Sequence, residues 1–283
     1  MLEDFHLHTL ISDGELTPTV LLAHAARHGV RRAAITDHDS LGAYRWEEGA
    51  VFSEARRLGV ELTVGIEMDA DWDGVEVHVL GLDVSLDDGR LNHHLTRVRE
   101  TRRERARREI DVVCGLLGAG AVREADVFVP GRETLMKPHF IRPLLARGFF
   151  ASYELANAWY HANVKTGIEV PRPDVGEAVR IIHEAGGWAS LAHAGYYERD
   201  GLAGVLERLP DLVAEGLDAV ELEYPYHACS PHLFGLEDER RFLAALRAAA
   251  ASLGLRFTRG SDAHAATDFE RSYGAGFASV SAR

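Results

Sequence analysis

The first third of the chain alternates short apolar runs with longer segments in which apolar residues recur at helical spacing. Runs with strand-like composition lie at residues 4–9, 33–36, 62–66 and 75–82. Helical patterns lie between them, at residues 17–29 and 43–58, the first closed by Gly29 and the second by Gly59. This β-α-β-α-β order favours a parallel sheet or barrel, with residues 67–71 and 75–82 paired as a hairpin.

The middle of the chain has a different pattern. From Leu91 to about Leu117 the sequence is helical and charge-dense, with arginines and glutamates interleaved. The helical pattern continues to Lys165, with breaks at glycines and prolines. We therefore predict a helical subdomain over residues 90–165, inserted into an α/β domain formed by residues 1–89 and 166–283. The arginine-rich face is interpreted as a solvated surface held by pairs with glutamate, and the alternative is a basic lip for a phosphate or an oligonucleotide tail.

The α/β alternation resumes after this segment. Strands are predicted at residues 188–192, 219–223 and 256–258, and helices at residues 174–185 and 237–253. The whole chain is therefore predicted to be an α/β protein with an interrupted barrel or parallel sheet.

Composition and charge exclude several classes of function. The 283 residues are 46% hydrophobic and 27% charged, as in soluble globular proteins. No segment resembles a signal peptide or is long enough to cross a membrane, and Cys114 and Cys229 lie far apart, so we expect a cytoplasmic protein. The net charge of −13 disfavours a groove for long nucleic acid, but not a small anionic substrate at a metal site.

Residue types that bind metal ions recur where the apolar runs end. His6 and His8 are two residues apart, as are Asp262 and His264, and this spacing places side chains on one face of a strand. A carboxylate such as Glu67 at the end of an apolar strand is costly to bury without a partner. Each group alone has an ordinary interpretation, as surface histidines or a salt-bridged turn residue, but six such segments together predict a metal site. The candidate ligands are His6, His8, Asp13, His38, Glu67, His78, His193, Asp262 and His264.

These motifs, in this order along essentially the whole chain, resemble the PHP family, the polymerase and histidinol phosphatase phosphoesterases. The resemblance implies a distorted (β/α)7 barrel with two or three divalent ions, Mn²⁺, Fe²⁺ or Zn²⁺, at its C-terminal rim. It implies a first ion held by His6, His8, Glu67 and Asp262. It implies a second ion held by Glu67, His78 and His193, with Glu67 bridging, and a third held by Asp13, His38 and His264.

A motif in the inserted segment is similar to one branch of that family. Residues 137–142, Lys-Pro-His-Phe-Ile-Arg, resemble the HFAR-type motif of nucleoside 3′,5′-bisphosphate phosphatases and a 5′→3′ oligoribonuclease. Pro138, Ile141 and Ala194 depart from the usual residues of this branch. The resemblance implies hydrolysis of a phosphomonoester or terminal phosphodiester of a nucleotide, either a 3′,5′-bisphosphate or the 5′ end of a short RNA.

Spacing and resemblance together suggest roles for residues outside the ligand set. His139 and Arg142 share a helix face at i, i+3, where they would grip a phosphate oxygen or protonate a leaving alkoxide, although a surface pair has the same spacing. Asp262 would orient or deprotonate the attacking water. His227 is expected either to touch substrate or to be an exposed loop residue.

Two other functions are compatible with the same metal-ligand pattern. A histidinol-phosphate phosphatase would share the metal core, but the helical insertion and its His139 motif argue against it. A non-catalytic PHP domain would keep the fold and lose the metals, and the intact ligand set argues against that.

Overall fold

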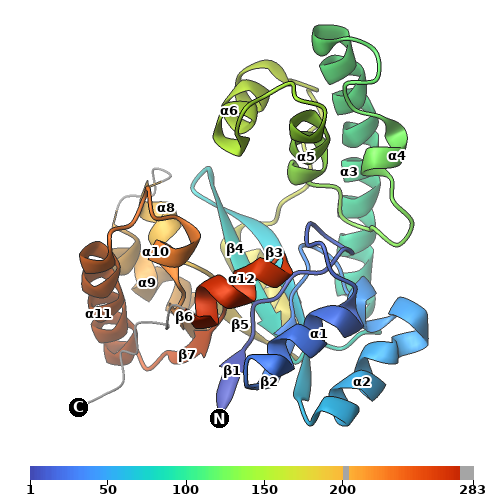
Figure 1. Cartoon of the computed structure of the whole chain (residues 1–283). Coiled ribbons are helices and arrows are strands. Elements are labelled where there is room, and N and C mark those ends of the chain that lie inside the picture. The colour runs from blue at the N-terminus through green and yellow to red at the C-terminus, as the bar shows by residue number, and fades with distance from the viewer. Residues whose placement is uncertain (200–203, 275–283) are drawn as a thin grey trace.

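Seven strands form one sheet in the computed structural model, which describes residues 1–199 and 204–274 (Figure 1). The strands pair in chain order, and β4 runs antiparallel to both of its neighbours while the other pairs are parallel. They are β1 (Leu2–Asp4), β2 (Val30–Ile35), β3 (Glu61–Trp72), β4 (Val75–Leu82), β5 (Trp188–Leu191), β6 (Ala219–Glu223) and β7 (Arg256–Arg259).

The sheet closes on itself between its first and last strands. Phe5 N donates to the Arg259 carbonyl at 2.8 Å, and Leu7 forms a parallel bridge with Ala263. The predicted hairpin is confirmed, since β3 and β4 pair from Gly65–Leu82 to Trp72–Val75. The result is a closed seven-stranded sheet with one reversed strand, which confirms the predicted distorted barrel.

Helices cover the outside of the barrel, and several short turns lie at its rim (Figure 1). The helices outside the barrel are α1 (Pro18–Arg27), α2 (Ala50–Leu58), α7 (Val175–Glu184), α9 (Val205–Ala214) and α11 (Leu236–Ser252). The short elements are η1 (Gly42–Tyr44), η2 (Trp46–Gly49), α8 (Gly195–Arg199), α10 (Tyr226–Cys229), α12 (Ala266–Phe269) and η3 (Glu270–Gly274). Pro18 occupies the start of α1 as predicted, and Asp174 caps α7 by accepting from Glu177 N.

Two predicted boundaries were wrong. The strand expected over residues 4–9 ends at Asp4, because side chains take over some of the hydrogen bonds that a neighbouring strand would make, although others, such as that from His8 N to the Ala263 carbonyl, remain. Asp4 accepts from His6 N at 3.2 Å, and Thr36 Oγ1 accepts from Leu7 N at 3.2 Å.

The helix expected over residues 43–58 is divided into η1, η2 and α2. The buried Tyr44 side chain reaches between β2 and β3, where its hydroxyl accepts from Gly65 N at 2.8 Å and lies 2.8 Å from the Ile35 carbonyl. Glu47 and Glu48 then take positive φ values before α2 begins, so that the segment bends and does not form a straight helix.

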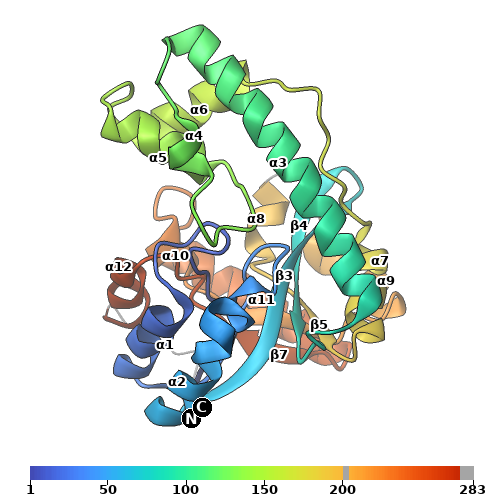
Figure 2. The same ribbon diagram turned by 90° about the vertical axis from the view of Figure 1, so that its right-hand side faces the viewer.

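The inserted segment projects beyond the barrel on one long helix (Figure 2). Its helices are α3 (Gly89–Leu117), α4 (Glu124–Val127), α5 (Pro138–Ala146) and α6 (Tyr153–Asn163). Leu91 and Leu95, at the start of α3, pack in the barrel core. From Ala106 onward, α3 contributes instead to a separate apolar cluster that includes Phe140 and Leu144 of α5.

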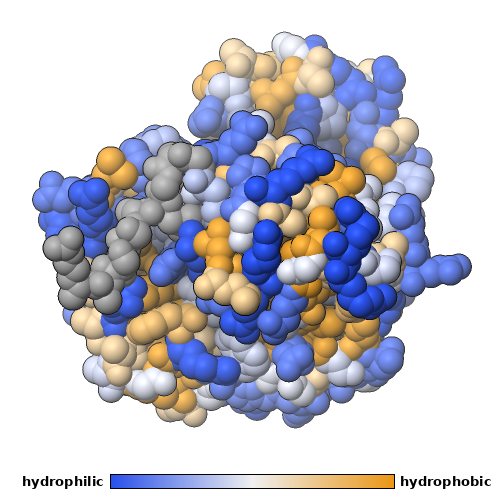
Figure 3. All heavy atoms as spheres, turned by 60° about the horizontal axis from the view of Figure 1, so that its bottom comes forward, coloured by the Kyte–Doolittle hydropathy of each residue, from blue (hydrophilic) through white to orange (hydrophobic). Residues whose placement is uncertain are grey.

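On the face in Figure 3, towards the end of the barrel away from the insertion, hydrophilic side chains are interspersed among apolar ones. Within residues 1–199 and 204–274, no helix has both the length and the apolar character of a membrane span. Cys114 and Cys229 are both free thiols.

Candidate metal centre

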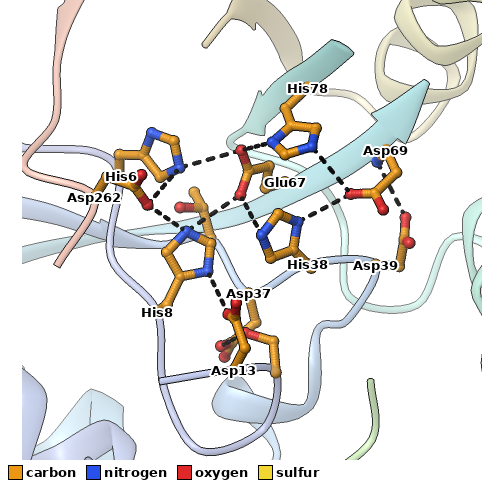
Figure 4. Close-up of polar contacts among 12 residues, drawn as sticks. His6, His8, Asp13, Asp37, His38, Asp39, Glu67, Asp69, His78 and Asp262 are labelled. Atoms are coloured by element: carbon orange, nitrogen blue, oxygen red, sulfur yellow. Dashed lines mark hydrogen bonds and ion pairs between the residues drawn. The ribbon is translucent and has the colours of Figure 1, made fainter. Parts of the chain in front are cut away.

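The candidate ligands converge at one end of the barrel, as the sequence predicted. His6 and His8 follow β1, His38 follows β2, Glu67 lies in β3, and Asp262 follows β7 (Figure 4). The remaining ligands are Asp13, in the loop after His8; His78, in β4; His193, after β5; and His264, after β7. Every predicted ligand belongs to at least one group of three or more donor atoms that lie within 4.8 Å of one another.

Glu67 lies at the centre of the set (Figure 4). Its Oε1 is 3.2 Å from His6 Nε2, 2.8 Å from His78 Nδ1 and 3.3 Å from His193 Nε2. Its Oε2 is 3.2 Å from His8 Nε2 and 3.3 Å from His38 Nε2. One fully buried carboxylate therefore contacts imidazoles from both sides, as a bridging ligand would.

Two further carboxylates flank Glu67. Asp262 Oδ1 lies 3.1 Å from His8 Nε2 and 3.5 Å from His6 Nε2. Asp13 Oδ1 lies 3.2 Å from His264 Nε2 and 3.7 Å from His8 Nδ1. The donor groups are thus arranged in a row, with Asp262 and His6 in one part, Glu67 in the middle, and Asp13 and His264 in another.

The three expected ion sites correspond in part to the observed donor groups. One group joins His6, His8 and Asp262, and another joins His8 and His38 with Asp13 and His264. The expected partners of the second ion are divided between two groups, because His193 lies with His6 and Glu67 while His78 lies with His38 and Glu67. The assignment of ligands to individual ions stays a prediction.

Several of the donor atoms have no hydrogen-bond partner within the protein, as expected of atoms that bind metal ions. His6 Nε2, both nitrogens of His8, Glu67 Oε2, Asp13 Oδ1 and His193 Nδ1 are buried without a hydrogen-bond partner. Buried polar atoms normally have partners, and those that lack them need a physical explanation. A mixed set of imidazole and carboxylate donors suits several first-row divalent metals.

The electrostatics of the site also favour bound cations. Burial alone would lower the pKa of His6, but Glu67, Glu221 and Asp262 raise it well above its ordinary value. Burial likewise opposes the shift at His8 and His38, yet contacts that include Glu67 raise the pKa of each to about 9. A field that stabilises imidazolium also stabilises a divalent cation bound to neutral imidazole.

A second layer of carboxylates, which the sequence analysis did not single out, orients these histidines. Glu221 in β6 is fully buried; its Oε1 lies 3.0 Å from His6 Nδ1, and its Oε2 accepts from His193 N at 2.9 Å. Asp69 in β3 lies 2.9 Å from His38 Nδ1. In both histidines a carboxylate at Nδ1 leaves Nε2 turned towards Glu67, an arrangement typical of metal-binding histidines.

The positions of Asp69 and Glu221 in the sequence could have indicated their role. Asp69 is two residues from Glu67 and shares its strand face, and Glu221 lies within the otherwise apolar run Ala219–Leu222. The close packing around Glu221 also explains Gly260, since a Cβ there would lie 2.1 Å from Glu221 Oε1 and 2.3 Å from His6 Cβ.

Two of the ligands have unusual backbone conformations. His193 has φ 25° and Asp262 has φ 53°, a region that residues other than glycine rarely adopt. His193 lies two residues after the end of β5, and Asp262 lies three residues after the end of β7. Strain of this kind persists only where the surroundings impose it, and it concentrates at functional sites.

The inserted segment is fastened to the loops that carry the ligands. Arg102 of α3 pairs with both Asp39 and Asp69, so one guanidinium joins the insertion to the carboxylate behind His38. Thr134 Oγ1 donates to the His38 carbonyl at 2.6 Å, and Arg142 donates to the Asp13 carbonyl at 2.9 Å. The insertion therefore contacts the backbone of two predicted metal ligands, His38 and Asp13.

His139 and Arg142 lie at the Asp13 side of the row. His139 Nδ1 accepts from Met136 N at 2.9 Å, so the ring proton of the neutral imidazole is on Nε2, which is buried without a partner. Burial, and then Arg132 nearby, lower the pKa of His139 to about 3. Arg132 is a further cationic residue at this position that the sequence analysis did not identify.

His227 lies apart from the ligand groups, on α10. Its Nδ1 is 2.8 Å from the Phe234 carbonyl, and its backbone N donates to Glu239 of α11. These contacts hold the loop between α10 and α11. A contact between His227 and substrate stays a prediction.

Comparison with known proteins agrees with this geometry. The PHP domain model matches residues 4–152. A 3′,5′-nucleoside bisphosphate phosphatase from Chromobacterium violaceum is 30% identical over 279 residues, which cover 96% of this chain and 90% of that protein. A 5′-3′ exoribonuclease from Escherichia coli is 32% identical over 197 residues, which cover 69% of this chain and 66% of that protein.

A solved structure shares the whole fold. It is an amidohydrolase from Chromobacterium violaceum with bound sulfate and no metal, 29% identical, with a TM-score of 0.75 over 94% of this chain and 88% of that one. Its agreement with the barrel, together with the sequence matches and the ligand set at the rim, identifies the family. The chain belongs to the PHP domain family.

Proposed function

We propose that this protein is a metal-dependent phosphoesterase that hydrolyses a phosphomonoester or terminal phosphodiester of a nucleotide. The observation that carries the proposal is the row of buried donor atoms around Glu67, with cationic side chains of the insertion beside it. A set of metal ligands alone would also be compatible with metal storage or with a purely structural metal site. Ligands beside cationic side chains suit the binding and hydrolysis of a phosphate ester.

The residues present would hold two or three divalent ions, with Mn²⁺, Fe²⁺ and Zn²⁺ all compatible with the donors. When bound, such ions supply Lewis acidity and a water of lowered pKa. The nine predicted ligands would hold the ions, and Glu67 would bridge two of them. Glu221 and Asp69 would keep the Nε2 atoms of His6 and His38 free to coordinate by holding their Nδ1 atoms.

Asp262 would orient the attacking water or accept its proton. Tyr224 donates to Asp262 Oδ2 at 2.9 Å and thereby fixes the carboxylate plane, while Oδ1 faces His8. A carboxylate held in this way cannot rotate freely, so its position relative to the phosphorus atom would be set before substrate binds.

His139 and Arg142 would hold the scissile phosphate. Because Nδ1 of His139 accepts a backbone hydrogen bond, we assign His139 the role of a neutral donor through Nε2–H, in place of the proton transfer to a leaving alkoxide that the sequence suggested. Arg142 would add a full charge, and Arg132 lies close enough to contribute to the same field. Together they would stabilise the charge that develops in the transition state.

The favoured substrates are a nucleoside 3′,5′-bisphosphate and the 5′ end of a short RNA. Similarity to the Chromobacterium violaceum phosphatase over nearly the whole chain supports the first, and similarity to the Escherichia coli exoribonuclease supports the second. The net charge of −13 is compatible with a small substrate held at a metal site and disfavours long nucleic acid. The free thiols of Cys114 and Cys229 support the proposed cytoplasmic location.

A substrate panel tests this function. Protein stripped with chelator and reloaded with Mn²⁺ would be given adenosine 3′,5′-bisphosphate, AMP, histidinol phosphate and a 5′-phosphorylated short RNA, and phosphate or nucleotide release would be followed. We expect kcat/KM to be highest for the bisphosphate or the RNA. A preference for histidinol phosphate would reject the nucleotide assignment, and release from none of the four, with metal bound, would reject the function.

A further inference from the structure

The two lysines of the chain, Lys137 and Lys165, meet at one histidine. They are the only lysines among 31 basic residues, all others being arginine. Lys137 precedes α5 and its Nζ lies 2.7 Å from His161 Nε2 at the end of α6. Lys165 follows α6 and donates to the His161 carbonyl at 2.7 Å. We call these three residues the lysine cluster.

The lysine cluster has no anionic partner. Throughout residues 1–199 and 204–274, no carboxylate oxygen lies within 4.0 Å of either lysine ammonium, whereas arginines of α3 such as Arg90, Arg102 and Arg105 each pair with one. Burial lowers the pKa of Lys137, and Arg105 lowers it further. Burial and both lysines also lower the pKa of His161. The cluster thus gathers positive charge that no carboxylate contacts directly, although Glu76 partly offsets it from a greater distance.

The lysine cluster lies on the Glu76 and His78 side of the insertion, whereas Arg142 contacts the loop of Asp13. Glu76 acts electrostatically on both Lys137 and His161, and its Oε1 lies 3.7 Å from His78 Nε2. His78 is the predicted ligand on β4, whereas Arg142 bonds to the loop of Asp13. The insertion therefore presents one cationic group beside Asp13 and another towards His78.

We propose that Lys137, His161 and Lys165 form a second phosphate-binding site, which takes a phosphate group of the substrate other than the one hydrolysed. This inference rests on the proposed function, in which the metal centre and Arg142 hold the scissile phosphate. Two ammonium groups and an imidazole nitrogen supply several donors to one anion, and hydrogen bonds between ionised groups are among the strongest in proteins.

Two substrate classes offer that second phosphate. In a nucleoside bisphosphate it is the other monoester, and in a short RNA it is the next phosphodiester linkage. The site would therefore select nucleotides with two phosphates over those with one. It would explain how one metal centre discriminates among phosphate esters that present the same reacting group.

Lysine acylation gives a direct test, because the chain has so few amines. The Asp262→Asn variant, in which we expect turnover to be lost, would be acylated briefly in Mn²⁺ with an N-hydroxysuccinimide acetate and analysed by peptide mass spectrometry. It would be labelled alone and with saturating adenosine 3′,5′-bisphosphate, AMP or the dinucleotide pApA. We expect the bisphosphate or pApA to protect Lys137 and Lys165, and AMP to protect them less. The exposed amine of Met1 serves as the internal control. Equal labelling in all samples would overturn the proposal.

Kinetics of variants give an independent test that does not depend on labelling. In Lys137→Met and Lys165→Met, we expect KM for the bisphosphate to rise about tenfold more than KM for AMP, the size of one lost charged hydrogen bond. Lys→Arg at either position should restore part of the preference. The control is Arg90→Met, which removes an exposed cation of α3 paired with Glu184 and should leave both KM values as they are.

The two tests separate this inference from the proposed function. Hydrolysis of nucleotides with an unaltered preference in both lysine variants would overturn the second site and leave the metal-dependent activity standing. Absence of hydrolysis by the metal-loaded wild-type protein would reject the proposed function, whatever the lysines do.

Discussion

The barrel rim and the insertion contribute different kinds of residue to the same site. The rim provides His6, His8 and Glu67, which are fully buried and held by neighbouring side chains. The insertion provides Arg142 and Lys137, which keep part of their surface exposed. Metal binding needs a fixed set of donors, whereas recognition of a substrate needs accessible groups, so we assign chemistry to the rim and selectivity to the insertion.

The two regions meet through apolar packing of Leu91 and Leu95 at the start of α3 and through polar contacts of the insertion with the rim. Among the ion pairs is that of Arg102, whose side chain is 10% exposed between Asp39 and Asp69. Because Asp69 also contacts His38, a displacement of α3 would reach a predicted metal ligand through one intermediate residue. The rim and the insertion therefore have different roles, but a movement of the insertion would be transmitted to the metal ligands.

Removal of a rim ligand should have the largest effect on activity. In His8→Ala or Asp262→Asn, turnover should fall by at least about a thousandfold, because an ion and the water it activates lose their positions. Circular dichroism should show a folded protein. The matched control is His93→Ala, an exposed histidine on α3. Near-normal rates in His8→Ala at saturating metal would contradict the assigned centre.

Removal of the joint between the regions should mainly cost stability. Arg102→Met leaves the buried carboxylates of Asp39 and Asp69 side by side without a cation, and breaking a buried pair in this way costs about 3–5 kcal/mol. Urea unfolding would measure the change. The control is Arg105→Met, one turn further along α3. Because Arg105 pairs with Glu109 on the same helix, we expect this variant to lose less than about 1 kcal/mol of unfolding free energy. Equal losses of unfolding free energy in the two variants would show that the ion pairs of Arg102 contribute no more than an ordinary surface pair.

A change in the second layer should weaken metal binding without removing it. Glu221→Gln keeps the size of the side chain but removes the charge beside His6, and such changes typically weaken metal affinity by about 10–100-fold. Competition with a fluorescent chelator would measure it. Glu223→Gln, on the same strand but paired with Arg259, is the control. Unchanged affinity in Glu221→Gln would mean that His6 does not depend on this carboxylate.

A change in the insertion should affect substrate and leave the metal in place. His139→Phe removes the Nε2–H donor, and we expect kcat/KM for nucleotides to fall about tenfold, as for one lost hydrogen bond to a charged group. Metal content, measured by inductively coupled plasma mass spectrometry, should stay at the wild-type value. Loss of metal in this variant would contradict the assignment of metal binding to the rim and substrate binding to the insertion.

Much of the rim was predictable from the sequence, and the physical reason is specific. A single histidine or aspartate at the end of an apolar run has ordinary explanations, but six such segments together indicate metal binding. His6 and His8, two residues apart, both contact Glu67 even though β1 ends at Asp4. The bend at Tyr44 was not predictable, because it depends on where β2 and β3 lie relative to that side chain. The reversed direction of β4 followed from the short turn of the hairpin.

The insertion was predictable as helices but not as part of the site. The arginine-rich face of α3 was expected to be solvated, yet Arg102 is only 10% exposed between two aspartates, while Arg108 is exposed. Helical spacing alone cannot distinguish these arginines, since the distinction arises from the docking of α3 against the barrel. The meeting of Lys137 with Lys165 likewise depends on how α5 packs against α6.

The most direct test of the account is metal-dependent turnover by one preparation. Chelator-stripped protein would be titrated with Mn²⁺ while bound metal and phosphate release from adenosine 3′,5′-bisphosphate are measured together. We predict no phosphate release without metal, and full release once two or three ions are bound per chain. Equal turnover in the presence of chelator, or a fully loaded protein that releases phosphate from no nucleotide, would contradict it.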